Sequence, residues 1–363
     1  MEAPRVPDYE GACLSGLVPA LLGGDRSWLP EPVRQPGSPT VLLVIDGLGW
    51  LQLCERWLLA PCLAALSGGP IHSVAPTTTA AALTSISTGT PPGEHGIVGY
   101  RMYVHGDILN VLRWSTAEGD ARRRIPPEQI QHRSAFRDTQ PVAVTKAEFA
   151  ASGFTLAHLA GVRHRGWRLP STLIVETAAA VRAGERFVYA YYDGPDRVAH
   201  EYGLGAHYDA ELAATDRLVA ALLGALPAGT QVLVTADHGQ VDVGTNIVTP
   251  AREVLAHTRL QSGEGRFRWL HAQRGREGEL LAAATTAHAH HAWVVSLAQM
   301  RDERWFGPHL APAAAARLGD VALVARDPIS FDDPADSGAF ALIARHGSLT
   351  ASEVLVPLLA ATV

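Results

Sequence analysis

Three continuous apolar runs interrupt the mixture of polar and hydrophobic residues along this chain. They cover Thr40–Ile45, Phe187–Tyr192 and Gln231–Thr235. Short apolar runs rich in β-branched or aromatic residues are typical of strands that are buried on both faces of a parallel sheet. We therefore predict three buried strands, distributed over the first two thirds of the chain.

Helical patterns and further short strands alternate with these runs. The predicted helices cover residues 51–66, 172–183, 206–226 and 351–359. The further strands are predicted over residues 71–74, 321–325 and 340–343. Such an alternation indicates an α/β fold with a mostly parallel sheet that is covered by helices on both faces.

Three segments depart from this alternation. Residues 1–38 are rich in Pro and Gly and are expected to form an arm packed on the domain. Residues 101–168 and residues 250–310 contain loops and short elements, and we expect them to extend over the carboxyl edge of the sheet as lid insertions. No linker separates these segments, so residues 1–363 are expected to form a single catalytic domain.

Acidic and imidazole side chains follow the predicted strands at the point where each strand ends. The carboxyl ends of parallel strands share one edge of a sheet, which is where ligands bind in open α/β folds. Asp196 and His200 are four residues apart, so a helix would place both on one face. The candidate ligands at this edge are Asp46, Asp196, His200, Asp237, His238 and His346.

Each of these residues has a commoner explanation when it is taken alone. An Asp after a strand usually caps a turn, an Asp–His pair on a helix is usually a surface pair, and Asp-His-Gly is a common loop. Their joint position at strand ends favours a metal site instead. Carboxylate and imidazole ligands suit Zn²⁺, with Mn²⁺ or Fe as alternatives.

A run of threonines lies between a predicted strand and a short helix. Pro76 favours extended backbone, and Thr77, Thr78 and Thr79 precede a helix-forming segment that ends at Gly89. The helix N-terminus offers free N–H groups and a positive dipole end to an oxyanion. The alternative is that these threonines serve only as N-caps.

The composition excludes several classes of protein. The chain has 363 residues, is 47% hydrophobic and carries a net charge of -6, so we expect no nucleic acid polymer and no membrane as a partner. Its three cysteines form neither a zinc motif nor a disulfide framework. The N-terminal residues lack the charged and apolar regions of a secretion signal, and we expect a cytoplasmic protein.

Six motifs, in order along the chain, resemble the alkaline phosphatase superfamily and most of all its nucleotide pyrophosphatase/phosphodiesterase branch. They are DGLG, PTTT, TGTPPGEHGIVG, PDRVAHEYG, TADHGQ and RHGS. The resemblance implies that Thr79 is the nucleophile and forms a phospho-threonine intermediate. It also implies two metal ions, one held by Asp46, Thr79, Asp237 and His238 and the other by Asp196, His200 and His346.

The chain differs from the phosphodiesterase branch at one position, and it lacks the features that mark two other branches of the superfamily, the monoesterases and the sulfatases. The phosphodiesterase branch has an Asn that donates to a phosphate oxygen three residues after the nucleophile, where this chain has Ala82. The chain has neither the arginine that monoesterases place beside the nucleophile nor the sulfatase sequence. Tyr100, Tyr103 and Trp114 could either stack on a leaving group or pack in the core.

The expected activity is therefore hydrolysis of a phosphodiester or a phosphoanhydride in a small, nucleotide-like molecule. The alternatives on the same scaffold are a phosphomonoesterase and a phosphonate hydrolase. A non-catalytic, metal-binding homologue is the most distant alternative, because every implied ligand and Thr79 are present.

Overall fold

The structure is a computed structural model in which residues 3–336 and 342–363 are described. Within these residues the largest sheet has seven strands. Their order across the sheet is β2 (Ser67–His72), β19 (Leu355–Thr362), β10 (Gln231–Thr235), β1 (Thr40–Ile45), β9 (Phe187–Tyr192), β7 (Val142–Lys146) and β8 (Arg163–Trp167). The strands from β10 to β8 are parallel, and only β19 runs against its neighbours. The predicted mostly parallel sheet is confirmed.

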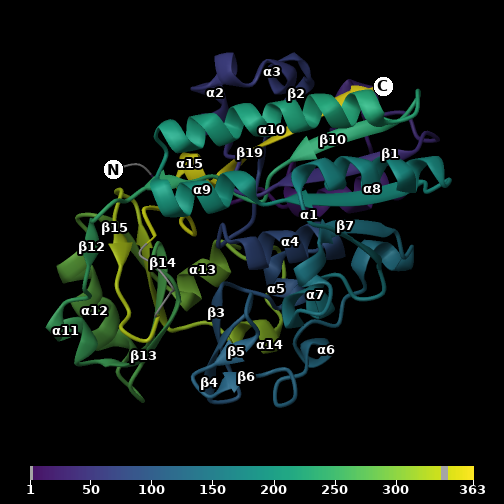
Figure 1. Cartoon of the computed structure of the whole chain (residues 1–363). Helices are drawn as coiled ribbons and strands as arrows, with labels where there is room; N and C mark the ends of the chain where they lie inside the picture. Colours follow the sequence, from purple (N-terminus) through teal and green to yellow (C-terminus); the bar gives the residue numbers. More distant parts are fainter. Residues whose placement is uncertain (1–2, 337–341) are drawn as a thin grey trace.

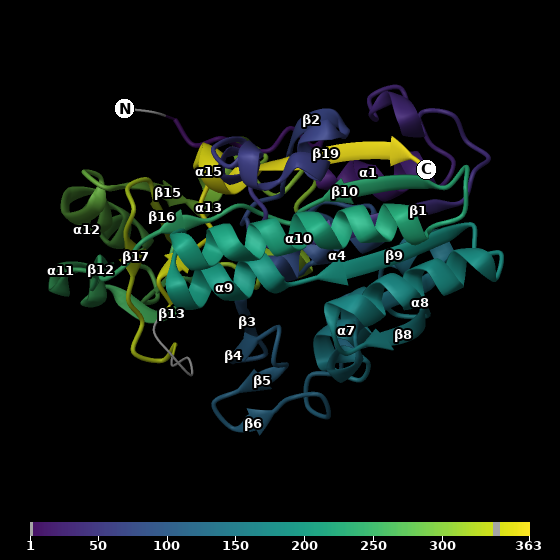
Figure 2. The same ribbon diagram turned by 45° about the horizontal axis from the view of Figure 1, so that its top comes forward.

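Helices cover both faces of this sheet (Figures 1 and 2). One face carries α8 (Pro170–Arg182), α9 (Gly194–Tyr202) and α10 (Ala206–Ala225), which pack on one another. The other face carries α1 (Leu14–Leu21), α4 (Thr79–Thr88) and α7 (Gly153–His158). Every residue of β1, β9 and β10 is buried between these layers. The continuous apolar runs of the sequence therefore reflect burial on both faces of the sheet.

A second sheet lies beside the carboxyl edge of the first and is antiparallel. Its strands are β13 (Thr258–Glu264), β14 (Phe267–Ala272), β16 (Val321–Ala325) and β15 (Ala292–Ser296). The short helix α11 (Arg252–Leu255) and the longer α12 (Glu277–His288) accompany it at the left of Figure 1. The strand predicted over residues 321–325 thus exists, but it belongs to this second sheet.

A small antiparallel sheet and several short elements complete the described chain. The small sheet contains β3 (Arg101–Val104), β4 (Asp107–Asn110), β5 (Ser115–Thr116) and β6 (Gly119–Asp120). Paired two-residue strands are β11 (Val241–Asp242) with β18 (Ala344–Arg345), and β12 (Ile247–Val248) with β17 (Ser330–Phe331). The remaining helices are α2 (Trp50–Cys54), α3 (Pro61–Ala65), α5 (Pro92–His95), α6 (Pro127–Ile130), α13 (Leu297–Asp302), α14 (Pro312–Ala315) and α15 (Ala351–Val354), and the 3₁₀ turns are Glu31–Val33, Trp57–Leu59, Ala135–Asp138 and Ala147–Phe149. No helix of the described residues combines the length and apolar character that crossing a membrane requires.

Two of the predicted helices are wrong in extent. The helix expected over residues 51–66 is divided into α2, a 3₁₀ turn and α3, because Pro61 cannot donate inside a helix and instead begins a new one. The helix expected over residues 351–359 ends at Val354, and the apolar residues that follow form β19. An apolar run of that length fits a buried strand as well as a helix. Here it forms a strand because it pairs with β2 and β10.

Three strand assignments also change. Strand β2 begins at Ser67, earlier than predicted, because an edge strand tolerates Gly and Pro residues. Strands β7 and β8 place residues 142–167 in the main sheet, so only the first part of the segment 101–168 is peripheral. The strand predicted over residues 340–343 lies partly outside the described residues, and β18 follows it.

Candidate active site

The six predicted acidic and imidazole ligands meet Thr79 at the carboxyl edge of the main sheet. Asp46 follows β1, Asp237 and His238 follow β10, and Asp196 and His200 lie on α9 after β9. His346 comes from the segment that follows β18. Five separate segments of the chain therefore supply side chains to one site, as the positions at strand ends predict.

Three oxygen atoms of the first group lie around Nε2 of the His238 ring. Its Nε2 lies 3.1 Å from Thr79 Oγ1, 3.4 Å from Asp46 Oδ1 and 3.4 Å from Asp237 Oδ2. All four side chains are buried, with Thr79 the most exposed at 8%. This group matches the first set of ligands that the family resemblance implies.

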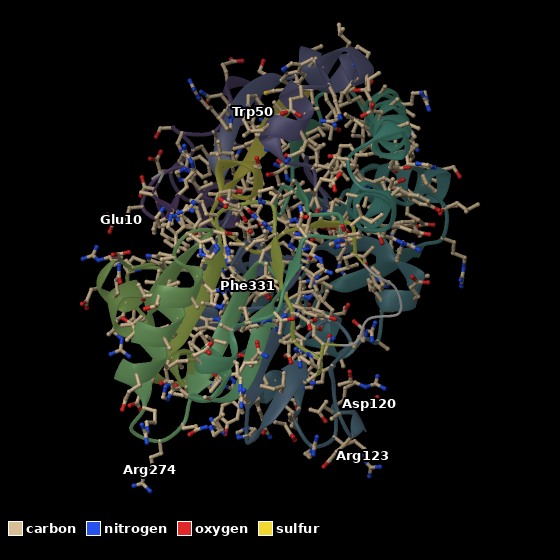
Figure 3. All side chains as sticks on the ribbon, turned by 90° about the vertical axis from the view of Figure 1, so that its left-hand side faces the viewer. Glu10, Trp50, Asp120, Arg123, Arg274 and Phe331 are labelled. Carbon is tan, nitrogen blue, oxygen red and sulfur yellow. The ribbon has the colours of Figure 1, made fainter. Side chains whose placement is uncertain are left out.

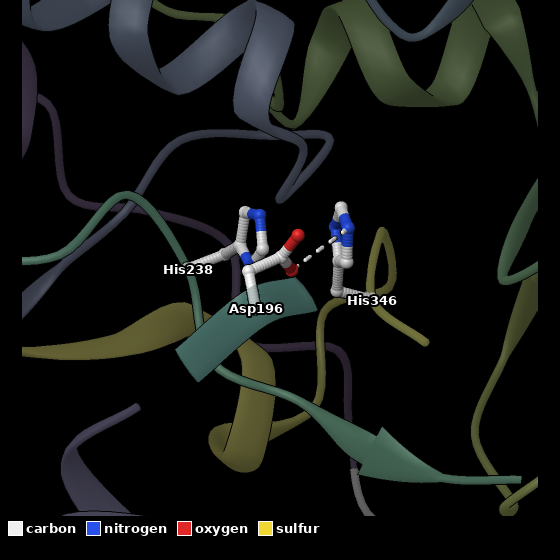
Figure 4. Close-up of side chains that lie close together, drawn as sticks. All are labelled: Asp196, His238 and His346. Atoms are coloured by element: carbon white, nitrogen blue, oxygen red, sulfur yellow. Dashed lines mark ion pairs between the residues drawn. The ribbon is translucent and has the colours of Figure 1, made fainter. Parts of the chain in front are cut away.

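The second group lies beside the first and is more open. Asp196 Oδ1 is 3.3 Å from His200 Nε2 and 3.9 Å from His346 Nε2. Figure 4 shows Asp196 beside the rings of His238 and His346, with the dashed line joining the Asp196 carboxylate to His346. The side chains of Asp196, His200 and His346 keep exposures of 13%, 16% and 13%, so this group faces the cavity.

Backbone carbonyls fix the orientation of all three imidazole rings. A carbonyl oxygen can only accept a hydrogen bond, so the ring nitrogen that faces it carries the proton and the other presents its lone pair. In each ring the protonated atom is Nδ1 and the lone pair is on Nε2, which points into the site. The three contacts are His200 Nδ1 to Ala344 O at 2.8 Å, His238 Nδ1 to Gly239 O at 3.1 Å, and His346 Nδ1 to Thr77 O at 2.8 Å.

The carboxylates carry more negative charge than their own surroundings neutralise. Burial raises the pKa of Asp46 well above its ordinary value, and the neighbouring Asp237 raises it further. Burial also raises the pKa of Asp237. Among the described residues, Asp46 Oδ1 and Asp237 Oδ2 are buried without a hydrogen-bond partner. Paired buried carboxylates with free oxygens and a free imidazole lone pair are a donor set that fits a divalent cation.

Local backbone geometry explains why glycines accompany these ligands. Gly47 has a φ of +71°, and a Cβ there would lie 2.9 Å from the Cα of Asp196. Its N–H donates to Asp237 Oδ1 at 3.1 Å. A Cβ on Gly239 would lie 2.0 Å from the carbonyl oxygen of Ser352. These two positions need glycine because a side chain would push the ligand-bearing loops apart.

The three threonines have different environments. Thr78 is the N-cap of α4, and its Oγ1 accepts from the N–H of Ala81. Thr77 is fully buried, and its Oγ1 donates to Ser348 O at 2.8 Å. Only Thr79, the first residue of α4, faces the two ligand groups. The N-cap interpretation is thus confirmed for Thr78. Thr79 lines two cavities, and Thr78 lines one of them as well.

Two cavities flank Thr79. The first has a volume of about 280 Å³, and its lining is largely apolar and aromatic, including Phe149, Phe154 and Tyr189. The second has a volume of about 360 Å³ and contains more polar groups, including Tyr100 and Glu264. Leu112 and Asp196 also line both. A substrate whose phosphorus lies at Thr79 therefore meets an apolar surface on one side and a polar one on the other.

The structure also decides the role of the remaining aromatic candidates. Trp114 is fully buried and its Nε1 donates to Ile125 O at 2.7 Å, so it packs in the core. Tyr103 packs against His271 in the second sheet. Tyr100 alone lines a cavity beside Thr79. Ala82 is fully buried and is absent from the lining of both cavities, so a donor to substrate has to come from another residue.

Sequence reasoning missed three side chains that support the ligands. The Tyr191 hydroxyl donates to Asp46 Oδ2, and Gln240 Nε2 donates to Asp196 Oδ1 at 2.5 Å. Glu353, fully buried, accepts from the N–H of Ser348 in the loop after His346. Gln240 lies inside the TADHGQ motif and could have been found there, whereas nothing in the local sequence marks Tyr191 or Glu353.

Taken together, the sheet topology, the threonine at a helix start and the two carboxylate–imidazole groups define a hydrolase of the alkaline phosphatase superfamily. The chain belongs to the type I phosphodiesterase / nucleotide pyrophosphatase family, whose sequence profile matches residues 40–349. It is therefore an enzyme of this hydrolase family, as the motifs predict. No curated protein matches the chain in a sequence comparison.

Solved structures share the fold at low sequence identity. Murine ectonucleotide pyrophosphatase / phosphodiesterase 5 superposes with a TM-score of 0.67 and 16% identity over 88% of this chain and 87% of that chain. An inactive threonine-to-alanine variant of that protein, in complex with AMP, gives a TM-score of 0.67 and 15% identity over 89% and 88%. Phosphonoacetate hydrolase from Sinorhizobium meliloti 1021, in complex with phosphonoformate, gives 0.66 and 18% over 91% and 92%.

Proposed function

We propose that this enzyme hydrolyses a phosphodiester or a phosphoanhydride in a small, nucleotide-like molecule, with Thr79 as the nucleophile. One observation carries the proposal. Three imidazole Nε2 lone pairs, the free oxygens of Asp46 and Asp237 and the Thr79 hydroxyl are all directed at one region between two cavities. Buried polar atoms normally have hydrogen-bond partners, and the two buried carboxyl oxygens that lack one, Asp46 Oδ1 and Asp237 Oδ2, support a cation between them.

Two divalent cations fit this arrangement, and zinc suits a set of imidazole and carboxylate donors. Asp46, Thr79, Asp237 and His238 would hold one ion, and Asp196, His200 and His346 would hold the other. His238 also lies close enough to Asp196 and His346 to join the second group. When bound, the pair supplies positive charge for the phosphoryl group, activates oxygen nucleophiles and stabilises the leaving oxygen. Zinc and a cytoplasmic location are both parts of this proposal.

Thr79 then performs the covalent chemistry. Its Oγ1 gives up its proton and forms a bond to phosphorus while the bond from phosphorus to the leaving oxygen breaks, and the leaving oxygen takes up a proton. In the second step a water oxygen attacks the same phosphorus, the bond to Oγ1 breaks, and the threonine hydroxyl is restored. The inactivity of the murine threonine-to-alanine variant supports a threonine in this role.

Helix α4 orients the phosphoryl group for these steps. Thr79 and Ala80 begin the helix and line the more polar cavity, so the first-turn N–H groups lie beside the reacting hydroxyl. An oxyanion is favoured there by the N–H groups and the helix dipole. This backbone supplies donors that Ala82 lacks. The buried position of Thr79 keeps bulk water from competing with substrate.

A panel of three nitrophenyl substrates tests the proposal. The metal-loaded enzyme should hydrolyse a nitrophenyl phosphodiester with a higher kcat/KM than the nitrophenyl monoester or a nitrophenyl phosphonate. Faster hydrolysis of the monoester would show a phosphomonoesterase, and faster hydrolysis of the phosphonate would show a phosphonate hydrolase. Bound metal without hydrolysis of any of the three would show a non-catalytic homologue.

A further inference from the structure

The larger of the two cavities beside Thr79 contains two arginines that come from distant parts of the chain. Arg113 lies in the segment between β4 and β5, and Arg345 belongs to β18, next to His346. Both side chains line the cavity that also contains His200 and Thr79. The sequence places no arginine beside the nucleophile, so this proximity arises only in the folded chain.

Neither guanidinium group forms an ion pair with a carboxylate within the part of the chain that the structure describes. The charges of Asp336 and Asp332 act on Arg345 only at longer range. Among the described residues, Arg345 donates to a backbone oxygen, that of Leu342, at 3.3 Å. Arg113 is exposed, and only its backbone N–H has a hydrogen bond, to Asn110 Oδ1. Most other buried or half-buried arginines near this cavity are paired, as Arg266 is with Glu353.

Three acids line the cavity, and within the described residues none of them forms an ion pair with Arg113 or Arg345. Asp196 is one of the proposed metal ligands. Asp336 already interacts with Arg268 at 3.4 Å and with Arg101 at 3.7 Å. Glu264 is 8% exposed, its Oε2 accepts from the Tyr100 N–H, and its Oε1 has no partner among the described residues. Burial raises the pKa of Glu264 to about 8, so at neutral pH this carboxyl carries a proton and can donate it in a hydrogen bond.

A hydroxyl donor completes the lining. The Tyr100 hydroxyl accepts from Asn110 Nδ2 at 2.6 Å, which leaves its own proton available to another acceptor. The cavity therefore holds two cations that have no ion-pair partner among the described residues, Arg113 and Arg345, together with two neutral O–H donors, Tyr100 and Glu264. Guanidinium groups bind carboxylates and phosphates through paired, charge-assisted hydrogen bonds.

We propose that this cavity binds a second anionic group of the substrate, a carboxylate or a phosphate, beside the phosphoryl group that Thr79 attacks. The proposal rests on the proposed function and narrows its substrate class. The substrate is a diester or anhydride with an acidic half in the cavity of Arg113 and Arg345. Its other half occupies the apolar cavity of Phe149 and Phe154, on the far side of Leu112.

Three matched nitrophenyl diesters test this inference with the metal-loaded enzyme. The second ester group is propyl, 2-carboxyethyl or 2-phosphonooxyethyl, so the three differ in the presence and kind of the anion. We expect kcat/KM for at least one anionic diester to exceed that of the propyl diester by roughly tenfold or more. The comparison of the two anionic diesters identifies the preferred group as carboxylate or phosphate.

Three variants assign the preference to its residues. In Arg113→Gln and Arg345→Gln the ratio of the anionic to the neutral kcat/KM should fall toward one. Arg274 is exposed at the edge of the molecule (Figure 3) and does not line the cavity, so Arg274→Gln should keep the wild-type ratio. Arg113 is distant in sequence from every proposed metal ligand, so its variant remains informative if Arg345→Gln disturbs metal content.

The outcomes separate the two proposals. Hydrolysis of the propyl diester with no preference for either anionic diester would overturn this inference and leave the proposed function standing. A preference that both glutamine variants retain would overturn it as well. If none of the three diesters is hydrolysed, the proposed function fails and this inference fails with it.

Discussion

The rings of His238 and His346 lie face to face, with centroids 3.5 Å apart and planes inclined by 11°. They come from segments that follow β10 and β18, and each donates its Nδ1 proton to a backbone carbonyl. Burial lowers the pKa of His346 well below its ordinary value, and His238 and His200 lower it further. The stack thus brings together the two ligand groups and keeps the His346 Nε2 lone pair free.

Metal content should follow these two groups. We expect about two divalent ions per chain in the wild-type protein after zinc loading. His346→Ala should lower the content to about one ion and abolish hydrolysis, because Asp196 and His200 alone bind weakly. Elemental analysis after dialysis measures this. His132→Ala, an exposed position, serves as the control, and an unchanged ion content in His346→Ala would contradict the ligand assignment.

Thr79→Ala should lower kcat by about three orders of magnitude or more, because the hydroxyl that attacks phosphorus is removed. Thr79→Ser should retain measurable activity, since the hydroxyl remains and only the methyl group that restricts its rotamer is lost. Both are measured with the nitrophenyl diester at matched metal content. Thr78→Ala is the control, and it should cost only the helix cap, about 1 kcal/mol of stability. A Thr79→Ala enzyme more active than Thr78→Ala would show that the nucleophile is misassigned.

The buried ion pair between Arg266 and Glu353 should be critical for the His346 loop. Both side chains are fully buried, and Arg266 Nε and Nη2 donate to the two Glu353 oxygens at 2.7 and 2.9 Å. Glu353 Oε1 also accepts from the N–H of Ser348. Glu353→Gln leaves a buried guanidinium partly unpaired, so it should destabilise the protein by about 3–5 kcal/mol.

Denaturant unfolding measures this loss of stability. Glu185→Gln is a matched control, because Glu185 also forms a two-bond pair with an arginine, Arg163, but at the surface. A surface pair contributes only about 0–1 kcal/mol. If both substitutions lowered the free energy of unfolding equally, burial of the Arg266–Glu353 pair would make no contribution to its effect on stability.

His95 should make the metal-free protein sensitive to acid. Its Nδ1 accepts from the N–H of Ile97, its Nε2 faces Ser85 Oγ at 2.9 Å, and burial lowers its pKa to about 3. The unfolded chain has an ordinary histidine pKa of about 6.5, so between these values only the unfolded state binds the proton. Stability is therefore lost as the pH falls below about 6.5.

Unfolding at pH 7, 6 and 5 tests the sign of this effect. His95→Gln should reduce the slope of stability against pH by about 1.4 kcal/mol per pH unit below pH 6, while lowering stability at pH 7. His132→Gln, at an exposed position, should keep the wild-type slope. A slope that is unchanged in His95→Gln would show that His95 is protonated in the folded protein.

Much of the site was already determined by the sequence. The runs at β1, β9 and β10 are apolar throughout because they are buried on both faces, and so their ends could be located and their polar residues assigned to one edge of the sheet. The helical spacing of Asp196 and His200 depends only on local geometry, and α9 confirms it. The order of the motifs identified the family.

Tertiary structure alone decided the rest. Residues 355–362 became a strand because β10 and β2 offered hydrogen-bonding edges, a choice that an apolar run does not make by itself. Arg113 and Arg345 share a cavity only because the small sheet and β18 both pack beside Thr79. Local patterns encode how a segment folds, whereas the neighbours of a side chain depend on contacts between segments far apart in the chain. The proposed metal ligands could therefore be predicted from strand ends, and the arginines that we propose to select the substrate could not.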